Sequence, residues 1–331
     1  MKAAIYTRYG APQSVSVKDV ATPAPAPDQI LIRVRASTVT TADWRLRASA
    51  FPGLLWLPGR LMTGLVAPKN PILGLEVAGE IVATGRDVTR FHIGQRVFGF
   101  TGGGAHAEYL ALSQDAAVLP IPTGMSDAEA AALPWGAVAA LVFLRDVARV
   151  KPGQDVLIVG ASGGVGVYAV QIAKAMGATV TGVCSAANVD LVRDLGADTV
   201  LDYRKTDIRA ARNAYDLVFD TVGATRYPKM IGALRKNGLF LPLNFGGREL
   251  WHLVLSRLIR GPRIKLFVNG DSAEDLRAVL AMVANGQLRP VVDRHFALDD
   301  IVSAHAYVEA RHRKGAVIVD MARAGDARAI A

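Results

Sequence analysis

The sequence predicts an α/β fold with two parts, a β-rich domain and a domain built on a doubly wound parallel sheet. Three observations predict it. Up to about residue 125, short segments alternate apolar and polar side chains, as half-buried strands do. From about residue 126, short apolar strands alternate with helical segments, which is typical of a parallel sheet covered by helices. A glycine-rich turn lies between the first of these strands and the next helix.

The β-rich part begins at residues 1–6, which we expect to form a strand and not a signal peptide. Residues 30–36 alternate apolar with charged side chains, and residues 77–83 and 95–100 are further expected strands. Pro23, Pro25 and Pro27 indicate a stiff linker between the early strands.

The second part begins at Ser126, which we expect to cap a helix together with Glu129 three residues later. Strands are expected over residues 156–159, 179–183, 199–202, 217–220 and 239–243. Helices are expected over residues 165–176 and 189–195. This alternation of strand and helix predicts the parallel sheet.

After residue 270 the pattern is less regular. We expect helices over residues 273–285 and 299–310, with strands over 291–296 and 316–320. This tail is short for a separate unit, so we expect it to complete the first domain. The predicted domains are therefore 1–125 together with 271–331, and 126–270.

The chain has 331 residues, of which 51% are hydrophobic, and a net charge of +9. The composition is that of a globular protein. The basic residues are scattered, with the densest cluster at residues 311–314, and no nucleic-acid-binding motif is visible. We therefore expect a solvated basic surface that also suits an anionic dinucleotide, and no nucleic-acid partner.

Cys184 is the single cysteine, which excludes an internal disulfide and a cysteine-rich zinc site. Proline and glycine interrupt the apolar stretch 51–66, and the stretch 250–259 is far shorter than the roughly 20 residues that span a bilayer. We expect a cytoplasmic protein without stable membrane insertion. The basic charge and these two stretches leave peripheral membrane association open.

Residues 160–166 read Gly-Ala-Ser-Gly-Gly-Val-Gly between a predicted strand and a predicted helix. In such a turn Gly163 and Gly164 let the backbone approach a pyrophosphate, and Gly166 lets the helix pack on the sheet. The helix N-terminus adds unpaired N–H groups. The alternative is a tight turn without a ligand, but the strand–turn–helix context favours a dinucleotide.

The residues after the second strand indicate which dinucleotide binds. An NAD site usually has a carboxylate about 20 residues after the turn. Here the strand ends in Gly-Val-Cys-Ser at residues 182–185, and Asp190 falls inside the next helix. Ser185 and Asn188 are small and neutral and would not repel a 2′-phosphate, which favours NADPH. The alternative for both residues is helix capping.

Seven motifs are spread over nearly the whole chain. They lie at residues 73–80, 94–99, 104–109, 150–153, 160–166, 195–198 and 202–203. Together they resemble the medium-chain dehydrogenase/reductases, in the zinc-free quinone oxidoreductase branch. The resemblance implies a GroES-like β-barrel catalytic domain built from both chain ends, a central Rossmann domain, and a cofactor cleft between them.

The resemblance also implies which residues bind the cofactor. Ser162, Gly163, Gly164 and Val165 would line the pyrophosphate. Ser185 and Tyr203 would contact the 2′-phosphate, although Tyr203 is alternatively an ordinary tyrosine at a strand end. The residues implied near the ribose and the nicotinamide are Val222, Leu243, Asn244, Phe245, Phe267, Val268 and Asn269.

Zinc ligands divide this family. The position of the catalytic cysteine falls in residues 37–43, which contain none, and Leu75 stands where zinc enzymes have a histidine. Leucine cannot ligate zinc, so we expect no metal site. Glu76 and His106 remain nearby. We expect Glu76 to make internal hydrogen bonds or to face the cleft, and His106 to be a strand or loop residue.

Without zinc, reduction of a quinone or of an activated C=C bond remains feasible, with the nicotinamide as hydride donor. Thr40, at a position where the family often has Asn, and Asn244 across the cleft are the candidate donors to the substrate carbonyl. Ala139 stands where the family often has a threonine. The stretch 51–66 either covers the cleft, which indicates a small apolar electrophilic substrate, or packs on the barrel as a surface loop.

Two other functions stay open. The chain is alternatively an NADPH-binding regulatory or interaction protein with little catalysis, which the absence of a hydroxyl at Ala139 would suit. A zinc-type alcohol dehydrogenase is disfavoured by Leu75. We also expect a homodimer, because residues 264–269 resemble a last sheet strand, and family members often pair such edges.

Overall fold

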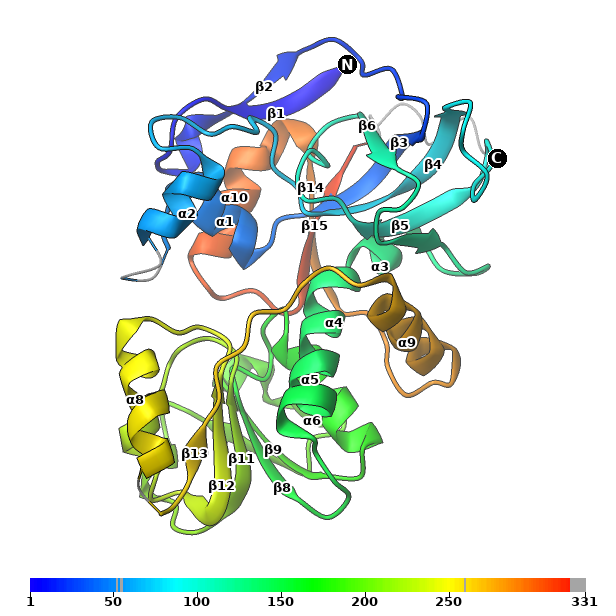
Figure 1. Cartoon of the computed structure of the whole chain (residues 1–331). Helices are drawn as coiled ribbons and strands as arrows, with labels where there is room; N and C mark the ends of the chain where they lie inside the picture. Colours follow the sequence, from blue (N-terminus) through cyan, green and yellow to red (C-terminus); the bar gives the residue numbers. More distant parts are fainter. Residues whose placement is uncertain (52, 54–55, 259, 322–331) are drawn as a thin grey trace.

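Two lobes, each with its own sheet, meet at a narrow waist (Figure 1). The computed structural model describes residues 1–51, 53, 56–258 and 260–321. Its upper lobe in Figure 1 holds both ends of the chain, and its lower lobe holds the middle.

The strands of the upper lobe pair antiparallel, except β14 and β15, which run parallel. Its seven-stranded sheet has the order β14-β15-β3-β4-β5-β7, with β6 paired to β3, and β1 pairs separately with β2. The strands are β1 Lys2–Tyr6, β2 Val15–Asp19, β3 Gln29–Thr38, β4 Glu76–Thr84, β5 Arg96–Phe100, β6 Tyr109–Ser113, β7 Val118–Pro120, β14 Val292–Ala297 and β15 Ala316–Asp320. The tail thus returns to this lobe, where β15 runs antiparallel to β3.

The lower lobe holds a six-stranded parallel sheet in the order β10-β9-β8-β11-β12-β13. The strands are β8 Asp155–Val159, β9 Thr179–Cys184, β10 Thr199–Asp202, β11 Tyr215–Asp220, β12 Leu234–Pro242 and β13 Arg263–Ile264. The strand order reverses between β8 and β11. In open parallel sheets, ligands bind beyond the carboxyl ends of the strands at such a reversal.

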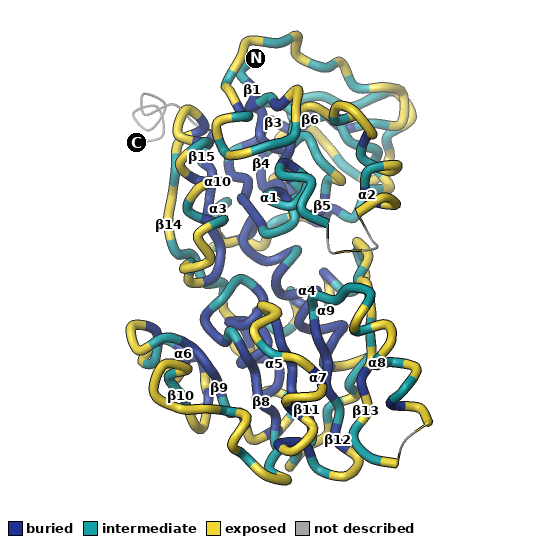
Figure 2. Tube along the Cα trace, turned by 90° about the vertical axis from the view of Figure 1, so that its left-hand side faces the viewer, coloured by how far each residue is buried: buried dark blue, intermediate teal, exposed yellow. Residues whose placement is uncertain are grey.

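The helices cover the sheets and fill the waist. They are α1 Thr41–Ala48, α2 Trp56–Thr63, α3 Asp127–Ala131, α4 Pro134–Val142, α5 Gly166–Ala175, α6 Val189–Asp194, α7 Tyr227–Met230, α8 Gly247–Leu258, α9 Ala273–Ala284 and α10 Ile301–Glu309. Helices α4 and α5 pack against each other, and α9 packs on α4. In Figure 2 the buried residues follow the strands and the inner helices of both lobes.

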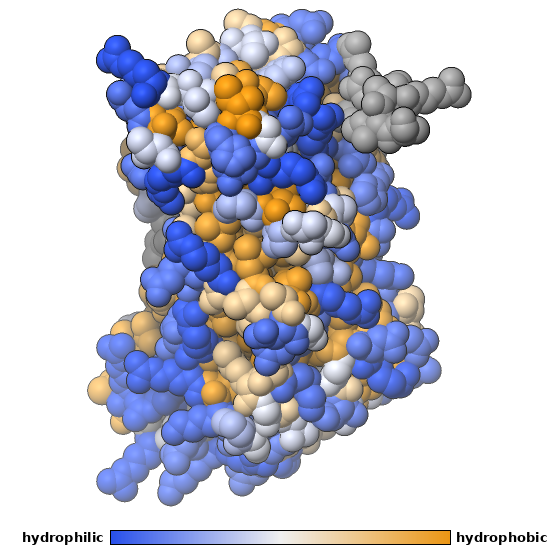
Figure 3. All heavy atoms as spheres, turned by 90° about the vertical axis from the view of Figure 1, so that its right-hand side faces the viewer, coloured by the Kyte–Doolittle hydropathy of each residue, from blue (hydrophilic) through white to orange (hydrophobic). Residues whose placement is uncertain are grey.

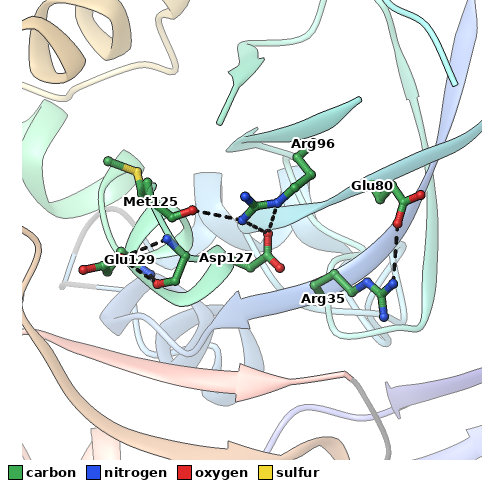
Figure 4. Close-up of polar contacts among 7 residues, drawn as sticks. Arg35, Glu80, Arg96, Met125, Asp127 and Glu129 are labelled. Carbon is green, nitrogen blue, oxygen red and sulfur yellow. Dashed lines mark hydrogen bonds and ion pairs between the residues drawn. The ribbon is translucent and has the colours of Figure 1, made fainter. Parts of the chain in front are cut away.

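The predicted capping box at Ser126 is confirmed. Ser126 Oγ accepts a hydrogen bond from the Glu129 N–H at 3.2 Å, and the Glu129 carboxylate accepts one from the Ser126 N–H at 2.9 Å (Figure 4). Asp127, in the same turn, pairs with Arg96 of β5 at 2.7 Å. Helix α3 also packs on β3 and β4. The start of the second part is therefore attached to the barrel.

One predicted element is wrong. Residues 264–269 do not form a full edge strand, because β13 ends at Ile264 after pairing with Leu239 and Phe240 of β12. Beyond this point the chain leaves the sheet, and Phe267, Val268 and Asn269 line a cavity instead. The domain bounds 1–125 with 271–331 and 126–270 remain a prediction, and residues 322–331 lie outside the described residues.

Candidate functional site

A cavity of about 1810 Å³ lies between the two lobes and takes residues from both. From the lower lobe it receives the residues that follow β8, β9, β11 and β12, which is the edge where a parallel sheet binds ligands. From the upper lobe it receives residues of α1, of the segment 69–75 and of the segment 311–313. Such a volume holds a dinucleotide and a small second molecule together.

The glycine turn forms one wall of this cavity. Gly160 has φ of +80°, and a Cβ on Gly166 would lie 2.1 Å from the Gly160 carbonyl oxygen. The predicted packing role of Gly166 is therefore confirmed. A Cβ on Gly163 would meet no protein atom closer than 3.3 Å, so this glycine leaves space on the cavity side.

The N-terminus of α5 follows the turn directly. Its N-cap is Val165, and no side chain caps the helix. The first N–H groups of a helix have no partner within the helix and carry a partial positive charge. Ser162, Gly163, Gly164 and Val165 all line the cavity at this point. The wall thus offers what an anionic pyrophosphate requires.

Ser185 and Asn188 also line the cavity, and neither side chain caps a helix. Both residues do occupy N-cap positions, Ser185 before residues 186–188 and Asn188 before α6, but neither side chain makes a capping hydrogen bond. The Asn188 Nδ2 group donates to Ser162 Oγ at 2.9 Å, which joins the end of β9 to the glycine turn. Tyr203, at the end of β10, lines the cavity with about half of its surface exposed.

Basic side chains that were not predicted from the sequence also line the cavity in the segments after β10 and β11. Arg204 and Lys205 follow Tyr203, and the other lining cations nearby in the chain are Arg209, Arg226 and Lys229. Arg209 is paired with Asp207 at 2.6 Å. These lining cations all follow the ends of β10 and β11, so the predicted strand ends could have indicated them. We name Arg204 and Lys205 the basic pair.

Asp220, at the end of β11, organises the loop that carries Val222. Its buried carboxylate accepts hydrogen bonds from the backbone N–H groups of residues 222–225 and from the Thr225 hydroxyl, at 2.7–3.2 Å. This fixes Val222 against Gly160, where a Cβ on that glycine would lie 2.5 Å from Val222 Cγ1. Leu243, Asn244 and Phe245 line the cavity beside this loop.

Thr40, a predicted donor, is not among the lining residues. It is the N-cap of α1, its hydroxyl donates to Asp43 Oδ2 at 2.5 Å, and its side chain is buried. The neighbouring Thr41 lines the cavity. Arg313 Nη2 donates to Thr41 Oγ1 at 3.1 Å, which leaves the hydroxyl proton of Thr41 free to point elsewhere. The geometry thus assigns a helix cap to Thr40 and a cavity hydroxyl to Thr41.

Arg313 joins the two lobes at the glycine turn. Its side chain is partly buried, and its Nη1 donates to the Val39 carbonyl at 3.0 Å. A Cβ on Gly164 would lie 2.8 Å from Arg313 Nη2, and the Gly315 N–H donates to the Ser162 carbonyl at 3.1 Å. From the sequence we expected the cluster 311–314 to be a surface feature, whereas Arg311, His312 and Arg313 line the cavity.

Glu76 is buried beneath the cavity. Its carboxylate accepts from the Thr38 hydroxyl and from the Trp135 N–H, the latter at 2.6 Å. Burial raises its pKa to about 7, against the lowering effect of these two hydrogen bonds. The internal hydrogen-bonding alternative is therefore confirmed, and Glu76 holds the start of α4 against β4.

His106 lies in a loop, as expected, and is fully buried. Its Nε2 contacts the Thr38 carbonyl at 2.9 Å, and its ring meets that of His305 edge to face, with centroids 5.7 Å apart. Burial lowers the pKa of His305 well below its usual value, and His106 and Arg47 add to this lowering. Within the described residues, no group of three or more His, Cys, Asp or Glu side chains is placed to hold a metal ion.

The upper lobe contributes many apolar side chains to the cavity, alongside the polar Arg45, Lys69 and Asn70. Phe51 and Met62, from the predicted cover 51–66, line it together with Thr63. The same stretch is held to the barrel, since the Tyr9 hydroxyl donates to the Gly64 carbonyl at 2.8 Å. Part of this stretch therefore covers the cleft, and part packs on the barrel. Pro52, Leu54 and Leu55 lie outside the described residues. Other apolar lining residues are Leu46, Ile72, Leu73, Leu75, Trp135 and Phe143.

Comparison with known proteins gives the following matches. Residues 26–123 match the alcohol dehydrogenase GroES-like domain, and residues 195–319 match a family described as zinc-binding dehydrogenase. The chain is 30% identical to the chloroplastic quinone-oxidoreductase QR1 of Triphysaria versicolor, over 97% of this chain and 98% of the relative. It is 33% identical to the trans-enoyl reductase pgmF of Aspergillus terreus, over 88% and 86%. The solved quinone oxidoreductase of Coxiella burnetii superposes with a TM-score of 0.85 at 28% identity, over 97% and 99%.

Proposed function

The chain belongs to the medium-chain dehydrogenase/reductase superfamily, among its quinone oxidoreductase-like members, and from this premise we propose that it reduces quinones or α,β-unsaturated carbonyl compounds with NADPH and without zinc. The observation that carries the proposal is an interlobe cavity that is lined by the glycine turn, by cations and by many apolar side chains. Members of this superfamily bind a nicotinamide cofactor, and the turn and the N-terminus of α5 fit its pyrophosphate.

Preference for NADPH is proposed from the charges around Tyr203. No carboxylate follows β9 at residues 184–188, and the basic pair lines the cavity beside Tyr203. Asp207, the nearest lining acid in the chain, is already paired with Arg209. A 2′-phosphate would thus meet cations and hydroxyl groups instead of an unpaired carboxylate.

A reduced nicotinamide, when bound, supplies hydride to the electrophilic carbon of the substrate. The residues of the chain then have to orient the substrate and stabilise charge on its oxygen. We assign this role to the Thr41 hydroxyl, which Arg313 orients, with Asn244 on the opposite lobe as a second donor. The apolar lining residues, Trp135 and Phe143 among them, would hold an apolar substrate and exclude water.

A substrate screen tests this function. We expect NADPH oxidation with a naphthoquinone and with a 2-alkenal, undiminished by prior treatment with a chelator. Saturated primary alcohols with NADP⁺ serve as the contrasting substrates. Turnover of the alcohols alone, dependent on added zinc, would contradict the proposal. Tight NADPH binding without turnover of any electrophile would instead favour a regulatory protein.

Location and assembly belong to the same proposal. Among the described residues, no helix combines the length and the apolar character needed to cross a bilayer. We propose a cytoplasmic homodimer, to be tested by cell fractionation and by light scattering at micromolar concentration.

A further inference from the structure

Large apolar side chains that are exposed to solvent concentrate in two segments. Of the sixteen such residues among the described part of the chain, twelve lie in residues 56–66 and 250–268. They are Trp56, Leu57, Leu61, Met62, Leu65, Val66, Leu250, Trp251, Val254, Leu258, Phe267 and Val268. We name these twelve side chains the apolar rim. Scattered exposed apolar residues are ordinary, but a contiguous set indicates an interaction surface.

Helix α8 shows the pattern most clearly. Leu250, Val254 and Leu258 are spaced by four residues and therefore form one stripe along the helix, and Trp251 lies beside them with 63% of its surface exposed. Leu253, by contrast, packs against the core of the parallel sheet. Helix α8 thus has apolar residues both toward the core and toward solvent. Packing against the core explains the apolar residues on the inner face, but not those on the solvent face.

The two segments come from different lobes but lie along one edge of the molecule. Helices α2 and α8 lie one above the other at the left of Figure 1 and at the right of Figure 2. Met62 and Val268 are 71% and 74% exposed and also line the cavity, so the rim reaches the cavity mouth. On a different face, shown in Figure 3, hydrophilic residues cover most of both lobes and apolar residues gather at the waist.

The charge around the rim is strongly positive. Residues 51–75 and 246–270 together contain seven lysines and arginines and one acidic residue, Glu249. The Glu249 carboxylate accepts from the Gly246 N–H at 2.8 Å. The cations are Arg60, Lys69, Arg248, Arg257, Arg260, Arg263 and Lys265. An anionic partner is therefore favoured. A second copy of the same rim would bring like charges together, so the proposed homodimer has to form through another face.

We propose that the apolar rim docks on the surface of an anionic phospholipid bilayer. Tryptophan and leucine side chains with flanking arginines are the composition of helices that lie in a membrane interface. The apolar side chains would enter the boundary between headgroups and acyl chains, while the cations attract anionic headgroups. The mouth of the cavity then faces the lipid. An apolar quinone or enone could then enter the cavity directly from the bilayer. This last step, unlike the docking itself, rests on the proposed reductase function.

Vesicle flotation tests the docking surface without any measurement of turnover. The probes are vesicles of phosphatidylcholine with 30% phosphatidylserine, and vesicles of phosphatidylcholine alone. We expect the wild-type protein to float with the anionic vesicles at low salt, and the bound fraction to fall at least tenfold at 0.5 M NaCl, because the headgroup attraction is screened. No flotation with anionic vesicles at low salt overturns the proposal.

Matched variants locate the surface. Trp251→Asp/Val254→Asp should lower the bound fraction at least tenfold, and Arg257→Glu/Arg260→Glu should lower it on anionic vesicles. The control is Ile93→Asp, because Ile93 is 64% exposed and lies outside the rim. Circular dichroism and NADPH binding verify that each variant is folded. An equal loss in the control, or a rim variant that becomes monomeric while still floating, would overturn the proposal. A protein that floats as expected but reduces nothing would contradict only the reductase function.

Discussion

Glu76 is buried where the two lobes meet, and its carboxyl group should make stability depend on pH. Burial raises its pKa from 4.5 to about 7, so between these values the folded protein holds a proton that the unfolded chain releases. Its contribution to stability is complete below about pH 4.5 and is lost as the pH rises through 7. Urea unfolding of wild type and Glu76→Gln at pH 5 and pH 8 measures this.

We expect the wild-type protein to lose on the order of 2–3 kcal/mol more than Glu76→Gln between these two pH values. The comparison with the variant removes the contributions of other titrating groups, such as His305. Identical losses in both proteins would show that Glu76 is ionised in the folded state at pH 5.

Thr40 and Thr41 are adjacent, and their roles should separate in experiment. Thr41→Val removes the hydroxyl that lines the cavity, so kcat should fall on the order of 100-fold with unfolding unchanged. Thr40→Val removes the N-cap of α1, so stability should fall by about 1 kcal/mol with a smaller effect on kcat. Steady-state kinetics and urea unfolding check both. A large fall in kcat for Thr40→Val, with Thr41→Val almost unaffected, would instead assign the donor role to Thr40.

The sequence pointed to Thr40 as the hydrogen-bond donor, but the residue that lines the cavity is its neighbour Thr41. Both threonines follow β3, and residue type alone does not tell which one caps the helix. The basic pair was missed for another reason. Arg204 and Lys205 directly follow Tyr203, but they share a cavity with the distant glycine turn because β10 lies beyond β9 and β8 in the same sheet.

At the scale of elements, the glycine turn and α5 allow a paired test. Gly166→Ala would force a Cβ to within 2.1 Å of the Gly160 carbonyl oxygen, so we expect a loss of about 1–3 kcal/mol in unfolding free energy. In Gly163→Ala the added Cβ would lie 3.3 Å from the Gly160 carbonyl oxygen, a much milder contact, so this variant should lose far less stability than Gly166→Ala. Because its methyl group would occupy the pyrophosphate side of the turn, the Kd for NADPH should rise at least tenfold.

Fluorescence titration with NADPH and thermal unfolding measure the two effects. If Gly163→Ala binds NADPH as tightly as wild type, the pyrophosphate does not lie against this turn.

Most strands could be predicted because their signal is local. Apolar runs such as 156–159 and 199–202 form β8 and β10 nearly as expected. The edge strand at 264–269 could not, since its apolar residues serve the cavity and not the sheet. The segment that forms α8 was recognised in the sequence only as the apolar stretch 250–259, because apolar residues on both faces of a helix obscure its period. The last residue of that stretch, Ile259, lies outside the described residues.

At the scale of the whole molecule, the function depends on two lobes that meet at the glycine turn. Arg313 and Gly315, from the end of the chain, contact this turn and the start of α1. The motifs predicted both lobes, but the contacts between them join residues distant in sequence. His106 and His305 are another such pair, and no local pattern indicates that their rings meet.

We propose that the cavity binds NADPH and that the bound cofactor delivers hydride to the substrate without zinc. The most direct measurement is kcat/KM for NADPH and for NADH with a naphthoquinone, in metal-stripped wild type and in Arg204→Ala/Lys205→Ala. We predict that wild type favours NADPH by at least tenfold, and that the variant loses this preference through a higher KM for NADPH, with NADH almost unaffected. Equal use of both cofactors by wild type, or activity that returns only with zinc, would contradict the account.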